Sequence, residues 1–354
     1  LAVMALFLCG CGPPQMVDRE IGPKARVSVG ELRSWAEQST TPQLSAQSYL
    51  LYDLASGRLL YEYNSQVARA PASLTKLMTA LLVFERADLN AVVQIVPEDL
   101  TEGATMGLAV GDTVSVNDLL WGLLLPSGND AASALARHVG GSVGSFVLTM
   151  NDRALELGLQ QTHFVNPHGL DAEGHVSSAA DILTLTQLLW EYPVFRSMVG
   201  TARAQWNGRD LINTNQLLTT FEGATGVKTG TTDIAGECLV ASIERDGRTV
   251  IMVIMGSSNR YQDAEILYNS FRASYSWDMT DGRDLSVINR VYDEEGRVWF
   301  MQPTGMAPVV LQHEAGVPEV RSFRRLDFGA SDGLAAGTQV GILEWWAGAE
   351  LVGS

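Results

Sequence analysis

Ser73 and Lys76 stand at the start of the apolar run SLTKLMTALL, with two residues between them. Residues three apart lie on the same face of a helix, so the lysine amine can reach the serine hydroxyl. The neighbours Leu74, Leu77 and Met78 are apolar, and a lysine among them loses water, which lowers its pKa and makes neutral amine available. The pair is therefore predicted to be a nucleophile and its general base.

Taken alone, this pair also fits a structural interpretation. About one S-x-x-K is expected by chance in a chain of this length with average composition. Serine is a favoured cap of a helix, and lysine is ordinary on a helix surface. The prediction therefore depends on which other polar residues accompany Ser73 and Lys76.

A second candidate is Ser127-Gly128-Asn129, which lies between two apolar helical patterns. The same form occurs at Ser115-Val116-Asn117 and at Ser257-Ser258-Asn259, so the pattern alone is weak. Pro126 and a glycine favour a tight bend in the middle copy. We expect this bend to aim a second hydroxyl and an amide into one cleft; the structural alternative is a turn with a helix cap.

A third candidate is Lys228-Thr229-Gly230, which occurs once, on a predicted strand. Chance supplies such a triplet in roughly one chain in ten. Gly226 and Gly230 remove bulky side chains on both sides, which permits close approach of a ligand backbone. The structural alternative is a surface strand with a solvated lysine.

The elements that must position these residues are strands at both ends and helices between them. SYLLYDLASGRLLYEYNS has the pattern of a hairpin, and SLTKLMTALLVFERA that of a buried helix with a serine cap. TGVKTGTT, GECLVASIERDG and RTVIMVIMGSS have the pattern of three strands, the last two joined at Asp246-Gly247. We expect the hairpin to join these strands in one antiparallel sheet with a helical cluster packed on it, an α+β fold.

The chain is predicted to have four segments. Residues 1–12 resemble a secretory or lipoprotein signal, and 13–45 have the Pro-, Gln- and Ser-rich composition of a linker. The α+β domain is expected over 46–279. Residues 280–354 alternate polar and apolar positions between Gly and Glu turns, which predicts a small all-β domain.

Composition limits the classes of function. The 354 residues are 46% hydrophobic, which is typical of a globular protein. The formal net charge is −16 and no basic run occurs, which argues against nucleic acid as a partner. The cysteines Cys9, Cys11 and Cys238 form neither a disulfide framework nor a metal-ligand spacing. Cys238 is expected to be a buried apolar residue.

The first residues read LAVMALFLCGCGPP. Their apolar run is too short to span a bilayer and suits the core of a secretory signal. LCGC resembles a lipoprotein signal in which Cys11 carries the lipid, although Cys9 stands where a small or hydroxylated residue is commoner. Export is expected; lipidation of Cys11 and a clipped signal with chance cysteines both remain open.

The combination of motifs is more specific than any one of them. The order S-x-x-K, S-x-N, K-T-G resembles the penicillin-recognising serine enzymes. APASLTKLMTAL, LLLPSGNDAASALA, FVNPHGLDAEGHVSSAADI and GVKTGTTDIAGECLVAS resemble motif blocks of the bacterial D-alanyl-D-alanine carboxypeptidases, from about Ser48 to Tyr275. Thr232 and Asp233 depart from that pattern, which bears on fine specificity.

This resemblance implies a role for each motif residue. Ser73 would attack the peptide bond between two D-alanines and form an acyl-enzyme, and Lys76 would take its proton. Ser127 would relay a proton to the leaving amine, and Asn129 would bind the substrate amide or the lysine.

The strand residues would act on the other side of the cleft. Lys228 would polarise the relay, and Thr229 would help to hold the terminal carboxylate. Gly230 would leave room for the substrate. The N–H groups of Ser73 and Thr231 would form the oxyanion hole, and the strand would pair with the extended peptide.

The same resemblance implies the partners. The substrate would be the peptidoglycan pentapeptide, with β-lactams as acylating inhibitors, on the extracytoplasmic side of the membrane or in the cell wall. The membrane would be met only through a lipid on Cys11. No cofactor or metal is required: His168 and His175 are seven residues apart with glycines between them, which is a poor metal-ligand spacing.

Three alternatives stay open. A class A β-lactamase shares the serine and lysine but needs a glutamate-bearing loop, and VNPHGLD stands where E-x-x-L-N would be. Endopeptidase action on cross-links would use the same residues. A non-catalytic wall-binding protein is disfavoured because Ser73, Lys76 and Lys228 are all intact.

Overall fold

The computed structural model places two compact units in the chain, one of them spanning Thr41–Ser270. The other comprises the described residues before and after it. The residues described are 5–10, 41–55, 57–279, 290–292, 298–304, 309–313, 320–326, 341–347 and 350–353. Cys11 and most of the predicted linker lie outside these ranges, so the signal and linker segments stay predictions.

The Thr41–Ser270 unit is built on a five-stranded antiparallel sheet with the order β3-β2-β10-β9-β8. Its strands are β2 (Ser48–Asp53), β3 (Arg58–Tyr63), β8 (Ala224–Thr232), β9 (Gly236–Arg245) and β10 (Arg248–Ser257). The predicted hairpin β2–β3 therefore joins the three late strands in one sheet, as the sequence indicated. Strand β8, which carries the K-T-G motif, is the last strand at its edge.

Local sequence explains the tight connection between β9 and β10. Asp246 and Gly247 have φ values of +54° and +72°, the left-handed region that a two-residue hairpin turn requires. Aspartate tolerates this region better than most residues, and glycine adopts it freely. The predicted turn is thus confirmed at these two residues.

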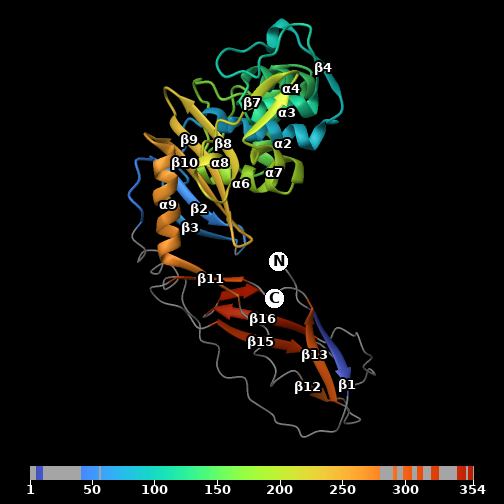
Figure 1. Ribbon diagram of the computed structural model, residues 1–354, viewed down its shortest axis with the longest axis vertical. Helices are drawn as coiled ribbons and strands as arrows, with labels where there is room; N and C mark the ends of the chain where they lie inside the picture. The colour runs from blue at the N-terminus through green and yellow to red at the C-terminus, as the bar shows by residue number, and fades with distance from the viewer. Residues whose placement is uncertain are drawn as a thin grey trace. The chain divides into compact units, whose positions relative to one another are not determined.

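Helices fill the sequence between the two groups of strands. The helical cluster contains α2 (Lys76–Arg86), α3 (Val116–Leu124), α4 (Asn129–Gly140), α5 (Val143–Glu156) and α6 (Ala179–Trp190), and a further helix, α9 (Arg260–Ser274), follows β10. Helix α6 contacts β2 and β10, while α9 runs along the sheet away from the helical cluster (Figure 1). The hydroxyl of Ser115 caps α3 by accepting the N–H of Asp118 at 3.0 Å.

Several short elements were not anticipated. They are the 3-10 turns η1 (Ala72–Thr75) and η2 (Pro97–Asp99), helices α7 (Pro193–Val199) and α8 (Leu217–Thr220), and the strand pairs β4 (Val92–Gln94) with β5 (Thr113–Ser115) and β6 (Arg203–Trp206) with β7 (Arg209–Ile212). One expectation is wrong: Ser73 does not cap the helix. It lies inside η1, whose N-cap is Pro71, and it makes no capping bond.

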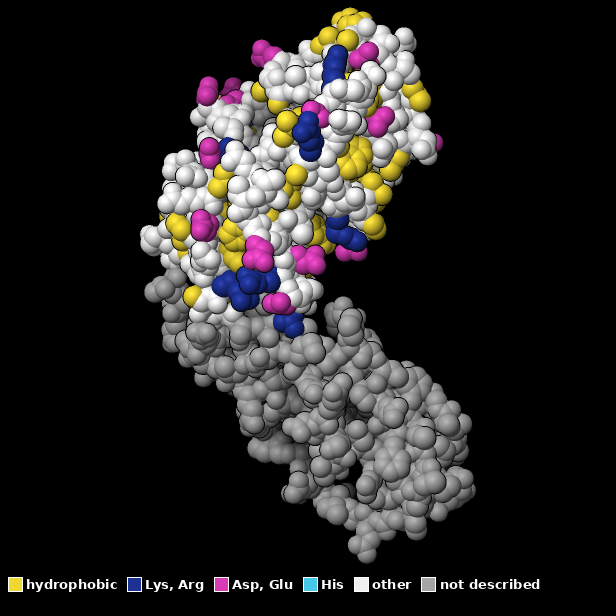
Figure 2. All heavy atoms as spheres, in the orientation of Figure 1, with side chains coloured by type: hydrophobic (Ala, Val, Ile, Leu, Met, Phe, Trp, Pro, Cys, Tyr) yellow, Lys and Arg dark blue, Asp and Glu magenta, His cyan; other side chains and the backbone are white. Residues whose placement is uncertain are grey.

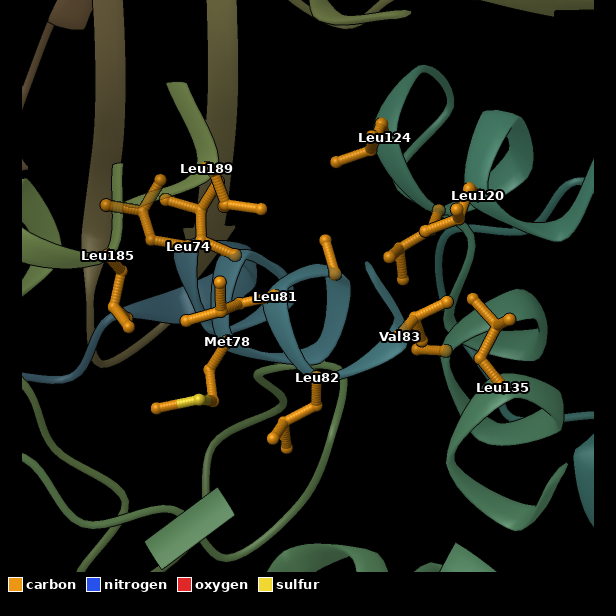
Figure 3. Packing of buried hydrophobic residues seen from close by; sticks show 14 of the residues in the cluster. Leu74, Met78, Leu81, Leu82, Val83, Leu120, Leu124, Leu135, Leu185 and Leu189 are labelled. Atoms are coloured by element: carbon orange, nitrogen blue, oxygen red, sulfur yellow. The ribbon is translucent and has the colours of Figure 1, made fainter. Parts of the chain in front are cut away.

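The core of this unit surrounds helix α2. Every residue from Lys76 to Val83 is buried, because other helices pack around this segment. Figure 3 shows Leu81 and Val83 of α2 among leucines from α3, α4 and α6. The start of α2 is therefore enclosed in protein, and so is the lysine at its first position.

The described residues from Tyr275 onward all lie in strands, as expected for an all-β domain. Strands β12 (Arg290–Tyr292), β13 (Val298–Thr304), β15 (Val320–Leu326), β16 (Gly341–Ala347) and β17 (Glu350–Gly353) share an antiparallel sheet with β1 (Ala5–Gly10). Strand β11 (Tyr275–Met279) pairs with β14 (Val309–His313). None of the motif residues lies in this unit.

On the face of the Thr41–Ser270 unit seen in Figure 2, acidic and basic side chains are interspersed. No continuous basic area covers the described residues on that face, in keeping with the net charge. No helix in the described part of the chain has both the length and the apolar character needed to cross a bilayer.

Replacing Leu81 by alanine tests the position of the core. Its side chain is 1% exposed, and we expect Leu81→Ala to lower the free energy of unfolding by about 2–5 kcal/mol because it leaves a cavity. Leu155→Ala is the matched control, since this helical leucine is 81% exposed and its loss is expected to cost less than about 0.5 kcal/mol. Denaturant unfolding measures both; equal losses would contradict the packing described.

Candidate active site

The three motifs meet at one place in the Thr41–Ser270 unit. Ser73, Ser127, Thr229, Gly230 and Thr231 line a single cleft with a cavity volume of about 330 Å³. They come from η1, from the loop before α4 and from the edge strand β8. The predicted residues Lys76, Asn129 and Lys228 are buried and do not line the cavity.

Lys76 is the centre of the site, and its amine has three oxygen neighbours. Its Nζ lies 3.0 Å from Ser73 Oγ, 2.7 Å from Asn129 Oδ1 and 2.7 Å from the His168 carbonyl oxygen. As an ammonium group it donates to all three. As a neutral amine it donates its two N–H bonds to the Asn129 and His168 oxygens, which leaves its lone pair for the Ser73 hydroxyl proton.

Burial decides between these two forms. The Lys76 side chain is fully buried, and this desolvation lowers its pKa well below the usual lysine range. The charge of Lys228 lowers the pKa further, and the buried carboxylate of Asp130 opposes both effects. The geometry therefore suits a general base for Ser73.

Asn129 is held so that its oxygen faces Lys76. Its Nδ2 donates to the carbonyl of Glu102 at 2.6 Å, which fixes the orientation of the amide. Its oxygen accepts from Lys76, so both ends of the side chain are engaged within the protein. Of the two partners considered for Asn129, the structure contains the lysine.

Asp130 fixes the loop beside this amide. Its carboxylate accepts backbone N–H bonds from Met106 at 3.0 Å, Leu108 at 3.1 Å and Gly107 at 3.2 Å. A buried carboxylate with several donors anchors a segment strongly. The segment that supplies the Glu102 carbonyl is thus tied to the start of α4.

Ser127 has an unusual backbone and an unpartnered hydroxyl. Its φ is +62°, which is uncommon for a residue with a side chain and is found at functional sites. Its Oγ is buried and has no hydrogen-bond partner among the described residues. A group of this kind is available to a ligand in the cleft. The other two S-x-N copies are a helix cap at Ser115 and the end of β10 at Ser257.

Lys228 is the second buried amine. Its Nζ donates to the carbonyl of Thr229 at 2.9 Å. Desolvation, and then the charge of Arg260, lowers its pKa to about 7. The whole sequence contains three lysines, and two of them, Lys76 and Lys228, are in this site.

Arg260, which belongs to none of the sequence motifs, also lines the cleft. It is held rigidly: Nη1 donates to the carbonyls of Gly230 at 2.8 Å and Cys238 at 2.9 Å, and Nε to Glu237 at 3.1 Å. Nη2 donates to the Thr231 hydroxyl. The cleft wall thus carries a fixed cation; only the chain fold brings it there, because Arg260 lies 29 residues after Thr231.

Other cleft residues were also missed, namely Ala104, Thr214, Gln216, Glu237 and Tyr261. Thr214 Oγ1 is 2.6 Å from Thr229 Oγ1, so it orients that hydroxyl. A larger cavity of about 520 Å³ opens between residues 41–49 and 62–69, and no motif residue lines it. The described residues contain no group of three or more His, Cys, Asp and Glu side chains placed to hold a metal ion.

The chain resembles proteins of one family. The family model described as D-alanyl-D-alanine carboxypeptidase matches residues 35–259. The D-alanyl-D-alanine carboxypeptidase DacF of Bacillus subtilis is 32% identical over 84% of this chain and 80% of its own length. DacD of Escherichia coli is 38% identical over 62% of this chain, which spans 60% of that relative.

Solved structures agree with this match. Penicillin binding protein 6B from Escherichia coli aligns with a TM-score of 0.68 and 30% identity, over 89% of this chain and 95% of that one. The DD-transpeptidase of Streptomyces K15 aligns with a TM-score of 0.63 and 33% identity, over 66% of this chain and 99% of that one. The Thr41–Ser270 unit thus has the fold of DD-peptidases.

The buried amine of Lys228 predicts how stability changes with pH. In the folded protein it loses its proton above about pH 7, but an unfolded lysine does so only near 10.5. Between these values the unfolded state binds more protons, so the free energy of unfolding rises with pH. We expect Lys228→Met to remove up to about 1.4 kcal/mol of this rise per pH unit.

Denaturant unfolding of the wild type and Lys228→Met between pH 7 and pH 9.5 checks this. The stability of the wild type relative to the variant should increase across that window. A constant difference would mean that Lys228 titrates as an ordinary lysine.

Proposed function

We propose, from the premise that the chain belongs to the D-alanyl-D-alanine carboxypeptidase family, that Ser73 is the nucleophile with which it removes the terminal D-alanine of peptidoglycan stem peptides. The chain is a serine-type hydrolase of that family. The observation that supports the assignment of Ser73 is the fully buried Lys76 amine, 3.0 Å from the Ser73 hydroxyl.

Acylation begins when Lys76 takes the hydroxyl proton. The Ser73 oxygen then forms a bond to the carbonyl carbon between the two D-alanines, and the negative charge moves to the carbonyl oxygen. We infer that the N–H groups of Ser73 and Thr231 receive that oxyanion. The C–N bond breaks next, and D-alanine leaves after its amine gains a proton.

The leaving amine needs a proton donor on its side of the cleft. Ser127 is the candidate, since it lines the cleft and its hydroxyl is buried and unpartnered within the described residues. We infer that it passes to the amine the proton that Lys76 took from Ser73. Lys228 supports this step because its pKa of about 7 keeps part of it charged at neutral pH.

The terminal carboxylate of the substrate needs a cationic partner. Arg260 and the hydroxyls of Thr229 and Thr231 line the same cavity, which supports carboxylate binding by this wall. The edge position of β8 leaves room for the extended peptide to lie beside it as another strand. A β-lactam carries a carboxylate next to its reactive amide, so it suits the same site as an acylating inhibitor.

Water ends the cycle by releasing the acyl group. The Streptomyces neighbour is named a transpeptidase, and such an enzyme passes the acyl group to an amine instead. The curated relatives named above are carboxypeptidases, which favours water as the acceptor here. Endopeptidase action is a second outcome of the same acyl-enzyme, distinguished by its substrate alone.

Peptidoglycan lies outside the cytoplasmic membrane, so we infer that the enzyme acts there. A lipid on Cys11 would tether it to the membrane, and the proposed segments 1–12 and 13–45 would then be signal and linker. Residues 280–354 carry none of the motif residues, which supports a role as a spacer or contact domain rather than in catalysis.

The oxyanion hole depends on how closely the chain packs around Ser73. A Cβ at Gly230 would lie 2.7 Å from the Ser73 nitrogen, and a Cβ at Gly169 only 1.9 Å from the Ala72 oxygen. Two glycines therefore enclose the peptide bond that carries the Ser73 N–H. Neither can gain a side chain without moving that group.

A labelled penicillin and a peptide ending in D-Ala-D-Ala test the function together. We expect a covalent adduct on Ser73 by mass spectrometry, and release of D-alanine from the peptide. Ser73→Ala should abolish both while remaining folded. Fast penicillin turnover without D-alanine release would instead identify a β-lactamase, and no reaction in folded protein would leave a binding protein.

Gly169→Ala tests the enclosure of the nucleophile. We expect penicillin acylation to slow by at least about 10²-fold, because the new methyl group displaces the Ala72–Ser73 peptide. Gly174→Ala is the matched control in the same loop. Gly169 and Gly174 both have positive φ, +94° and +77°, but a Cβ at Gly174 meets nothing closer than 3.8 Å. Equal effects of the two changes would refute the role of close packing.

A further inference from the structure

A chain of hydrogen bonds links the loop after α5 to the turn that carries the nucleophile. The N–H of Val165 donates to His175 Nδ1 at 2.9 Å. His175 Nε2 lies 2.8 Å from Thr75 Oγ1, and that hydroxyl donates to the carbonyl of Ala72 at 2.8 Å. This series of hydrogen bonds therefore ends at Ala72, the residue that precedes Ser73.

The direction of each bond in this chain follows from its two ends. A backbone N–H only donates, so Nδ1 of His175 is the acceptor and Nε2 carries the proton. A carbonyl only accepts, so the single hydroxyl proton of Thr75 points to Ala72. Nε2–H must then donate to Thr75 Oγ1, and no other arrangement satisfies all three groups.

Burial keeps this arrangement in place. Thr75 is fully buried and His175 is 3% exposed. Desolvation, and then the charge of His163, lowers the pKa of His175 to about 4, against a small opposing effect of Asp171. The imidazole is therefore neutral near pH 7.

The residue at the end of the chain has a strained backbone. Ala72 has a φ of +47°, a left-handed conformation that costs a residue with a Cβ about 1–2 kcal/mol. Its carbonyl must be held for this conformation to persist. The Thr75 hydroxyl donates a hydrogen bond to this carbonyl, and Gly169 has no side chain that would collide with it.

We propose that His175 and Thr75 are positioning residues for acylation: together they hold the Ala72 carbonyl, and so aim the N–H and the hydroxyl of Ser73 at the substrate. This inference rests on the proposed function. Neither residue contacts the cleft, since both are absent from its lining. They act only through the strained Ala72–Ser73 peptide.

Substitutions at Thr75 and His175 test the proposal on the full-length protein. Thr75→Val and His175→Phe keep side chains of similar shape but remove the hydrogen bonds that link Val165 to Ala72. Each should slow acylation by a labelled penicillin by about 10²-fold, with a fall in kcat and little change in KM on the D-Ala-D-Ala peptide. Thr75→Ser, which retains the hydroxyl, and His175→Gln, which retains an N–H donor, should stay within about fivefold of the wild type.

Thr186→Val is the matched control. Thr186 is also fully buried, and its hydroxyl donates to a backbone carbonyl at 2.8 Å, but that carbonyl belongs to Ile182 of α6. This change should lower the melting temperature about as much as Thr75→Val does, and alter the acylation rate by less than about twofold. The melting temperature alone would therefore not distinguish Thr75→Val from Thr186→Val, whereas the acylation rate would.

The double variant Thr75→Val with His175→Phe completes the test. Because both residues act through one bond, it should acylate about as slowly as either single variant. The proposal is overturned if Thr75→Val is acylated at the wild-type rate, or if Thr75→Ser is acylated as slowly as Thr75→Val. It is also overturned if the double variant shows the product of the two single rate losses, or if Thr186→Val slows acylation as much as Thr75→Val does. Wild-type protein that forms no adduct on Ser73 would overturn the proposed function as well. If the wild type forms the adduct but the variants do not behave as expected, only the positioning role of His175 and Thr75 is overturned.

Discussion

The removal of the Lys76 amine from water is the constraint on which the site depends. An amine in water is protonated at neutral pH and cannot accept the proton of a serine. Here the first turn of a central helix is enclosed by α3, α4 and α6, and two fixed oxygens take the N–H bonds of the amine. Three separate parts of the chain converge on one nitrogen: η1 with Ser73, the start of α4 with Asn129, and the loop with His168.

The same enclosure explains the charge distribution around the cleft. The chain carries a net charge of −16, yet Lys76, Lys228 and Arg260 are gathered at this one site. Arg260 forms an ion pair with Glu237, and Lys228 donates to the carbonyl of Thr229. Burying like charges together lowers the pKa of both lysines. A ligand with a carboxylate would bring a negative charge to this group of cationic side chains.

The sequence predicted the parts of the molecule that local patterns encode. Alternating apolar residues located the strands of the sheet, and Asp246-Gly247 located a turn, because both features depend on near neighbours. The spacing of Ser73 and Lys76 was enough to place amine beside hydroxyl. It was not enough to distinguish a helix cap from a 3-10 turn, which depends on the positive φ of Ala72 and its tertiary contacts.

What the sequence did not predict is determined by distant packing. Arg260 enters the cleft because α9 begins where β10 ends, and no spacing rule connects it with Thr231. Thr75 and His175 meet across 100 residues. The hairpin of β6 and β7 is too short and too polar to stand out from a loop. The domain boundaries and the role of each site residue remain predictions.

The most direct test is to observe the Lys76 amine itself. Protein labelled with ¹³C-lysine contains three lysines, so three ε-carbon signals are expected, and Lys76→Met assigns one of them by its loss. We expect the Lys76 signal to titrate well below pH 10.5, with the amine neutral at a pH where an ordinary lysine is still charged. A midpoint near 10.5 in folded, active protein would contradict this expectation, because Lys76 would then be an ammonium group and not the base for Ser73.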